Sequence, residues 1–173
     1  MHLPHPVAVV VMGVSGSGKS TIGALLARAL GCRFLEGDSF HDAAAVARMK
    51  AGHALTDEDR WPWLDRLGVA IGEAVAADGV SVAACSALKR SYRQRLADRI
   101  GMGARFVLLD PGTDKLRHRM VNRPHHYMPA SLLGSQLATL ERPGPEEPAL
   151  TLDGDLSPTA LCRKALHWLR TGA

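Results

Sequence analysis

The sequence predicts an α/β fold in which about five parallel strands form one sheet, with helices covering both faces. Short apolar runs rich in β-branched residues alternate with longer segments whose apolar residues recur every three or four positions, which indicates alternating strands and helices. The first run, Val7–Met12, is apolar throughout, as expected for a strand buried on both faces of a parallel sheet. Because parallel strands need crossover connections, this rhythm favours helices on both sides of the sheet.

The first half of the chain follows this rhythm with clear stop signals. The predicted strands are Val7–Met12, residues 33–35 and Val80–Ala84. The predicted helices carry apolar residues at helical spacing and two of them end at glycine. Their apolar positions are Ile22, Leu25, Leu26 and Leu30, after Lys19 and before Gly31; Leu64, Leu67, Ile71, Ala74 and Val75, before Asp78 and Gly79; and Tyr92, Leu96 and Ile100.

The second half continues the pattern, with strands predicted at 105–109 and Ala149–Leu152. Thr113 and Ser157 are expected helix N-caps, and Pro158 suits the first helical position. The polar segment 122–129 is expected to be a loop, and the Pro/Gly/Glu-rich segment 142–148 is too short and too late to separate two domains. We therefore expect one domain over residues 1–173. The apolar helical positions are Leu116 and Met120; Leu133, Leu137 and Leu140; and Leu161, Ala165, Trp168 and Leu169.

Composition narrows the class of protein. With 46% hydrophobic and 22% charged residues, the chain has the composition of an ordinary globular protein rather than a disordered one. The net charge of +4 suits anionic ligands, but the basic residues are scattered, so we expect no nucleic-acid partner.

Cys32, Cys85 and Cys162 lie far apart without a C-x-x-C pair, which argues against disulfides and structural zinc and favours a reducing cytoplasm. The chain start lacks a signal-peptide pattern and the longest apolar run is far too short to span a bilayer, so we expect no membrane partner.

The segment from Gly13 to Ser20 reads GVSGSGKS and matches the phosphate-binding P-loop (Walker A) motif G-x-x-x-x-G-K-[ST] completely. A buried strand precedes it and an amphipathic helix follows it, which argues against a chance match in a Gly/Ser-rich turn. The glycines let backbone N–H groups curl around phosphate oxygens, and the helix adds its positive end. Lys19 is expected to contact the β- and γ-phosphates of ATP and the Ser20 hydroxyl to ligate Mg²⁺. The expected nucleotide-binding residues are Gly13, Val14, Ser15, Gly16, Ser17, Gly18, Lys19, Ser20 and Thr21.

Other P-loop classes are disfavoured. The chain is too short for the large ATPases, and no Asn-Lys-x-Asp string specifies guanine. No hydrophobic strand runs into Asp-Glu. The nearest candidate is Asp110 after Leu108 and Leu109, and Asp110 could equally well just end a strand. A small phosphotransferase of P-loop NTPase architecture, using ATP and Mg²⁺, fits best.

Asp38 follows the second predicted strand within the string Glu36-Gly37-Asp38. The carboxyl ends of parallel strands face the ligand crevice, which places Asp38 where an acceptor hydroxyl would meet the γ-phosphate. Asp38 could accept the proton of that hydroxyl or hold Mg²⁺ through water. The alternative is that it merely caps the following helix.

Around these residues the chain resembles the gluconokinase family of small P-loop carbohydrate kinases, which are similar to shikimate and nucleoside monophosphate kinases. The resemblance covers about residues 8 to 153 in family order. The phosphate loop is widely shared, whereas the strings around Arg60 and Lys89 are more specific. The matching strings are MGVSGSGKST (12–21), EGD (36–38) with His41, LTDEDRWPWL (55–64), CSALK (85–89) with Tyr92 and Arg93, HYMP (126–129), and Ser135, Gln136, Thr139 and Glu141.

The resemblance implies ATP-dependent phosphorylation of D-gluconate at its terminal hydroxyl. A linear polyol with a carboxylate needs cations and hydroxyl partners. Arg60 and Lys89 are the expected cations, and Asp38, His41 and Ser86 the expected hydroxyl partners. Arg60 at a solvated helix end and Lys89 on an ordinary helix surface are the alternatives. Arg93 is a weaker candidate cation, for which an ordinary helix surface is favoured.

A lid over about residues 122–130 is also implied by the resemblance. Arg123 would close over the phosphates as a catalytic residue, Arg119 would lie against the adenine, and His126 would face the substrate. Trp61 and Trp63 are expected to pack rather than bind. The chain departs from the family pattern at Ala45, Arg48, Ala54 and Tyr127, where Asn, Lys, Pro and Phe are usual.

Two rival functions stay open on sequence grounds. One is a kinase of the same fold for shikimate or a nucleoside monophosphate, and the other is an ATP-sensing module without catalysis. The expected partner is a small sugar acid. The sequence does not determine the oligomeric state, and a homodimer is one open assembly.

Overall fold

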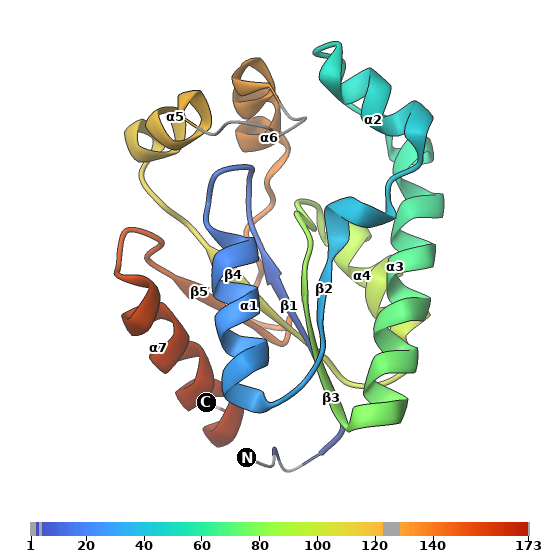
Figure 1. Ribbon diagram of the computed structural model, residues 1–173, viewed down its shortest axis with the longest axis vertical. Coiled ribbons are helices and arrows are strands. Elements are labelled where there is room, and N and C mark those ends of the chain that lie inside the picture. The colour runs from blue at the N-terminus through green and yellow to red at the C-terminus, as the bar shows by residue number, and fades with distance from the viewer. Residues whose placement is uncertain (1–2, 4, 123–128, 173) are drawn as a thin grey trace.

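The computed structural model describes residues 3, 5–122 and 129–172, and it confirms the α/β class (Figure 1). Parallel strands and helices alternate along the chain, as the apolar pattern predicts. The elements are β1 (Val7–Met12), α1 (Lys19–Leu30), β2 (Phe34–Glu36), the 3₁₀ helix η1 (Gly37–Phe40), α2 (Ala43–Lys50), α3 (Asp57–Asp78), β3 (Val80–Ala84), α4 (Arg90–Ile100), β4 (Ala104–Leu109), α5 (Thr113–Val121), the 3₁₀ helix η2 (Ala130–Leu132), α6 (Leu133–Thr139), β5 (Ala149–Leu152) and α7 (Pro158–Thr171).

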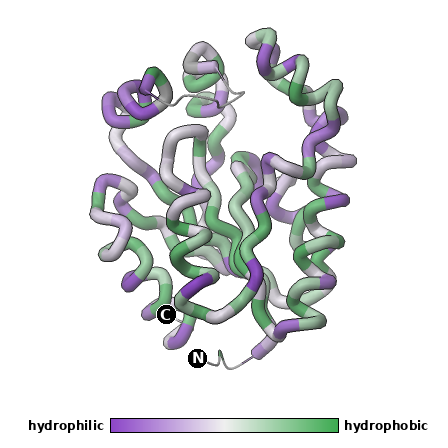
Figure 2. Tube along the Cα trace, in the orientation of Figure 1, coloured by the Kyte–Doolittle hydropathy of each residue, from purple (hydrophilic) through white to green (hydrophobic). Residues whose placement is uncertain are grey.

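The five strands form one parallel sheet in the order β2-β3-β1-β4-β5, with the phosphate-loop strand β1 at its centre. Successive side chains of β1 enter two separate cores, because strand residues alternate between faces. Val10 packs with residues of α3 and α4, whereas Val9 and Val11 pack with residues of α1 and α7. Both faces of β1 are therefore apolar, which explains its uninterrupted hydrophobic run. Figure 2 shows the hydrophobic colouring concentrated along the sheet between these helices.

Helix ends are set by local chemistry. α1 starts after Gly18 and ends at Gly31, and both glycines adopt the left-handed conformation. α3 starts with a capping box in which the Thr56 hydroxyl accepts from Asp59 N and the Asp59 carboxylate accepts from Thr56 N. This cap fixes the start of the helix that carries Arg60. Among the described residues, none of the helices combines the length and apolarity needed to cross a bilayer.

Several element boundaries differ from the sequence-based prediction. The second strand is shifted by one residue, Thr113 is the first residue of α5 instead of its N-cap, and Leu140 lies just beyond α6. Helix α2 was not predicted, because only Ala45 and Met49 of its eight residues are buried and its apolar periodicity is weak.

Candidate active site

The phosphate loop joins β1 to α1 and has the curled backbone that its glycines predict. Gly13, Gly16 and Gly18 have φ angles of 146°, 81° and 90°, values that side chains rarely tolerate. The loop closes on itself through a hydrogen bond of 3.2 Å from Ser17 N to Val14 O. Its concave side therefore faces the amino end of α1, where the helix dipole favours anions.

Several polar side chains of this loop are buried, where polar groups need hydrogen-bond partners. Lys19 is 8% exposed, and its ammonium lies 3.5 Å from Val14 O, at the outer limit of a hydrogen bond. Ser15 Oγ and Ser17 Oγ are buried and have no hydrogen-bond partner among the described residues. Buried donors are normally satisfied. A ligand rich in anionic oxygens, such as a nucleoside triphosphate, fits this phosphate loop.

Gln136 is a residue that sequence reasoning left without a role. It lies on α6, and its Oε1 accepts a hydrogen bond of 2.6 Å from Ser15 N in the phosphate loop. The two residues are 121 positions apart, so no local pattern could have indicated the contact. Gln136 ties the wall formed by α6 to the backbone amide of the phosphate loop.

Four of the expected acceptor residues line one pocket together with Lys19. Asp38 comes from η1 after β2, at the carboxyl edge of the sheet as expected, and Ser86 follows β3. Arg60 comes from the start of α3, and His41 from the segment after η1. The pocket is narrow, with a cavity volume of about 30 Å³. Leu132, Ser135, Gln136 and Thr139, from η2 and α6, form the facing wall.

The capping alternative for Asp38 is wrong. Asp42 is the N-cap of α2, and its carboxylate accepts a hydrogen bond of 2.7 Å from Ala45 N. Asp38 instead lies inside η1, next to Gly37, whose carbonyl accepts a hydrogen bond of 2.7 Å from Trp63 Nε1. The carboxylate is thus placed at the pocket by its own strand end and by α3.

His41 stacks on Trp63, with ring centroids 4.0 Å apart and planes inclined by 19°. Burial lowers the pKa of His41 to about 4, with opposing contributions from nearby charges. Its imidazole is therefore neutral near pH 7, and one ring nitrogen can donate while the other accepts. Trp63 is 2% exposed and packs, as expected.

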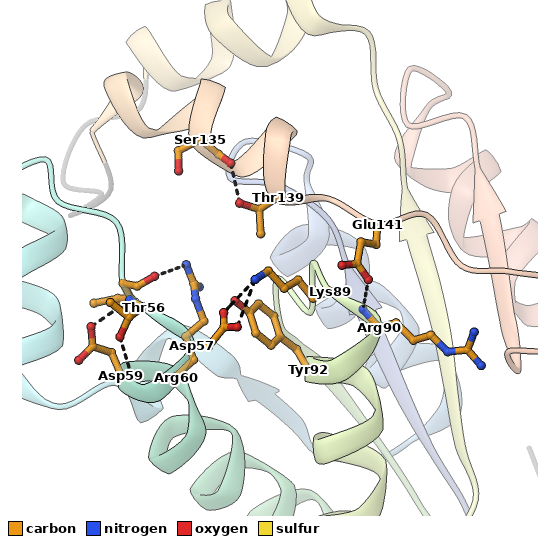
Figure 3. A network of polar contacts seen from close by, with 11 residues as sticks. Thr56, Asp57, Asp59, Arg60, Lys89, Arg90, Tyr92, Ser135, Thr139 and Glu141 are labelled. Carbon is orange, nitrogen blue, oxygen red and sulfur yellow. Dashed lines mark hydrogen bonds and ion pairs between the residues drawn. The ribbon is translucent and has the colours of Figure 1, made fainter.

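Arg60 and Lys89 both lie over the Tyr92 ring, 5.3 and 5.5 Å from its centroid, but they are held differently (Figure 3). Arg60 Nη2 donates to Leu55 O at 3.2 Å, while Arg60 Nε is buried without a hydrogen-bond partner among the described residues. Lys89 pairs with Asp57 at 3.0 Å and does not line the pocket. The Tyr92 hydroxyl also donates to Asp57, and the hydrogen bonds from Tyr92 and Lys89 lower the pKa of that carboxyl. Arg60 is the better placed of the two cations.

Arg93 is not the ordinary surface residue that the sequence favours, so that interpretation is wrong. It is 2% exposed and lies outside the pocket. Its Nε and Nη2 donate to the two carboxylate oxygens of Glu147 at 2.7 and 3.0 Å. The sequence favours an exposed position because the helix is rich in arginine, a residue whose side chain is usually exposed.

A second cavity borders the phosphate loop at Gly16, Ser17 and Gly18. It has a volume of about 460 Å³. Arg119 lines it and donates a hydrogen bond of 3.2 Å to Gly16 O. Asn122, Leu156 and Pro158 also line it. The adenine contact expected of Arg119 stays a prediction. Arg123 and His126, and most of the lid predicted at 122–130, lie outside the described residues.

The structure also shows the surroundings of Asp110 and of two positions that depart from the family pattern, Ala45 and Ala54. Asp110 follows β4 and pairs with Arg142 at 2.9 and 3.0 Å, so it ends the strand and joins the 142–148 connector. Ala45 packs with Met49, Leu55 and Leu132 in a small core beside the pocket. Ala54 lines the acceptor pocket itself. The departures from the family pattern at 45 and 54 therefore lie in or next to the acceptor wall.

Comparisons with known proteins agree with this geometry. A family model described as an AAA domain matches residues 9–143. The gluconokinase of Gluconobacter oxydans (strain 621H) is 45% identical over 162 residues, which cover 94% of this chain and 90% of the relative. The crystal structure of a gluconokinase from Sinorhizobium meliloti 1021 is 45% identical, with a TM-score of 0.81 and coverage of 95% of this chain and 92% of that one. An unliganded sugar kinase from Janibacter sp. HTCC2649 is also 45% identical, with a TM-score of 0.86 over 94% of this chain and 93% of that chain. The chain belongs to the gluconokinase family.

Proposed function

We propose that this protein catalyses the ATP-dependent phosphorylation of D-gluconate to 6-phospho-D-gluconate. The observation that supports it most directly is the shared pocket, in which the phosphate-loop ammonium of Lys19 and the carboxylate-bearing Asp38 lie with Ser86, Arg60 and His41. A phosphate donor and a polyol acceptor would meet there. Relatives named gluconokinases, at identities up to 45% over most of their length, supply the substrate class.

The chain's residues would carry the transfer as follows. The phosphate-loop amides and Lys19 bind the β- and γ-phosphates, and Asp38 accepts the proton of the terminal gluconate hydroxyl. As that oxygen forms its bond to the γ-phosphorus, the bond from phosphorus to the β–γ bridging oxygen breaks, and ADP leaves with the electron pair. Lys19 offsets the charge that develops on the transferring group, and Arg123 is proposed to add a second cation from the lid.

A Mg²⁺ ion is the proposed cofactor. The Ser20 hydroxyl would ligate it directly and Asp38 through water, and oxygen donors in small number suit this ion, which keeps several waters. Among residues 3, 5–122 and 129–172, no group of three or more His, Cys, Asp or Glu side chains is placed to hold a metal ion. The proposed site instead depends on phosphate oxygens for the remaining ligands. When bound, Mg²⁺ neutralises phosphate charge and orients the γ-phosphate.

Gluconate recognition is proposed to divide between charge and hydroxyl contacts. The guanidinium of Arg60 suits a carboxylate, and Lys89 could add a second cation if Asp57 releases it. Neutral His41, Ser86 and, from the lid, His126 are proposed hydroxyl partners. The pocket is narrow, at about 30 Å³, so we propose that the wall formed by η2 and α6 moves to admit gluconate. Closing again would exclude water from the transfer.

A coupled ADP-release assay over gluconate, shikimate and nucleoside monophosphates tests the proposal. Turnover with gluconate alone is expected. Turnover with another acceptor instead would favour a different kinase of this fold, and tight ATP binding without any acceptor-dependent turnover would favour a sensing module. Asp38→Asn is expected to keep ATP binding and to lower kcat by about 10²-fold or more, whereas Asp42→Asn, which preserves a helix cap, serves as the matched control. Lys19→Ala is expected to impair both nucleotide binding and turnover.

Three wider expectations belong to the same proposal. The free thiols of Cys32, Cys85 and Cys162 favour a cytoplasmic location, which cell fractionation would test. Light scattering would test a homodimer. Limited proteolysis, with and without ATP, would test one domain over 1–173 with a lid at about 122–130.

A further inference from the structure

The turn between β3 and α4 contains an unusual backbone conformation. Ala87 has a φ of 44°, and among the described residues it is the only one other than glycine with a positive φ. A residue with a Cβ in this region is unfavourable and needs surrounding contacts to hold it there. Ala87 is fully buried and stands between Ser86, which lines the acceptor pocket, and Leu88. The strained residue therefore lies between two residues that line the pocket, Ser86 and Leu88.

Arg93 supplies the contacts that hold this turn. Its Nη1 donates to Ala87 O at 3.0 Å and to Leu88 O at 3.3 Å. The rest of the guanidinium is fixed by the two-point pair with Glu147, which also accepts from Gly144 N at 3.0 Å. The side chains of Arg93 and Glu147 are 2% and 11% exposed, so solvent screens the pair little. A planar fork with several donors can satisfy a carboxylate and two carbonyls at once, which a lysine cannot.

The same turn contacts the phosphate loop. Ser86 O accepts a hydrogen bond of 3.3 Å from Gly13 N, the first residue of the loop. The Leu88 side chain packs with Val14 in a small core, and Leu88 O accepts a hydrogen bond of 2.8 Å from Glu141 N. The turn thus links the acceptor pocket to the phosphate loop and to the segment after α6.

We propose that Arg93 is a positioning residue for phosphoryl transfer. It holds Ala87 in its left-handed conformation within the turn at 86–89, so that Ser86 and the phosphate loop present acceptor and donor to each other. Arg93 is 2% exposed and does not line the pocket that holds Ser86, so the proposed role requires no contact with the substrate. This inference rests on the proposed function, since acceptor kinetics are one of its readouts.

The test compares Arg93→Met and Arg93→Lys with Arg95→Met. Arg95 is a matched control, because it lies on the same helix and makes a two-point pair with Asp65 at 2.8 and 2.7 Å, but contacts no part of the turn. A misplacement of about 1 Å costs roughly 10²-fold in rate, so Arg93→Met is expected to lower kcat/KM for gluconate by about that factor. Arg93→Lys is expected to recover only a part of the loss, and Arg95→Met to stay within about twofold of the wild type.

A second change separates positioning from general stability. Glycine adopts a positive φ without strain, so Ala87→Gly is expected to restore part of kcat/KM when combined with Arg93→Met or, if that variant does not fold, with Arg93→Lys. Amide hydrogen exchange over residues 85–89, measured without substrates, is expected to speed up in the Arg93 variants and not in Arg95→Met.

Two results would overturn the inference. The first is unchanged acceptor kinetics in Arg93→Lys together with unchanged exchange over 85–89. The second is a loss of activity that only tracks the unfolded fraction and that Ala87→Gly does not relieve. A wild-type enzyme that does not phosphorylate gluconate would instead count against the proposed function, and the exchange measurement would still judge the role of Arg93.

Discussion

Gly37 lies where the end of β2 passes close to the end of β3, one residue before the proposed base Asp38. A Cβ added at Gly37 would lie 2.2 Å from Ala84 O, whereas real Cβ atoms essentially never come closer than 3.0 Å to another heavy atom. The clashing atom is a backbone oxygen, which cannot turn aside as a flexible side chain can. Gly37→Ala must therefore separate the two strand ends by about 0.8 Å, the difference between 2.2 and 3.0 Å. The same shift would strain the hydrogen bond from Trp63 Nε1 to Gly37 O.

The expected result is a loss in both stability and rate. Overpacking of this kind costs about 1–3 kcal/mol in the free energy of unfolding. Because Asp38 moves with Gly37, a displacement approaching 1 Å is expected to lower kcat by roughly 10²-fold. Urea unfolding and the ADP-release assay measure the two effects separately.

Gly103→Ala is the matched control, since a Cβ there meets nothing closer than Pro6 O at 3.6 Å, an ordinary contact. It is expected to leave kcat unchanged. Wild-type stability and kcat in Gly37→Ala would refute the reasoning that close approach at this glycine sets the position of Asp38.

Three further predictions concern the pH response, a helix cap and the phosphate loop. His41 has a folded pKa of about 4, below its ordinary value of 6.5, so its contribution to stability is full above pH 6.5 and is lost as the pH falls toward 4. His41→Phe keeps an aromatic ring on Trp63, so urea unfolding across that pH range should show a smaller loss of stability in this variant than in the wild type. Equal losses would contradict this prediction. Thr56→Ala removes the cap of α3 and is expected to lower the free energy of unfolding by about 1 kcal/mol, whereas an unchanged urea midpoint would argue against the capping box. Gln136→Leu leaves Ser15 N without its acceptor and is expected to cost about 1–3 kcal/mol without nucleotide. With a non-hydrolysable ATP analogue bound, phosphate oxygens replace that acceptor, so thermal unfolding should show a smaller loss, and equal losses in both states would count against this competition.

Much of the fold was predictable because its signals are local. The run at β1 is apolar throughout because both faces of the strand are buried, and the glycines of the phosphate loop adopt the backbone angles that the motif requires. The rule that parallel strands end at one edge predicts a crevice position for Asp38, which lines the pocket in the structure. Helix α2 was missed because a short helix with a narrow buried stripe has little periodicity.

The sequence by itself therefore determined the α/β class, the phosphate loop and the strand end that brings Asp38 to the pocket. Only the tertiary structure decided which arginine is buried, which cation is already paired and which residue reaches the phosphate loop. Arg60, Lys89 and Arg93 have the same charge in the sequence, yet Arg60 lines the pocket, Lys89 pairs with Asp57, and Arg93 is sealed against Glu147. The physical reason is that these partners come from segments 32 and 54 residues away, and their contacts exist only once the sheet and helices have packed.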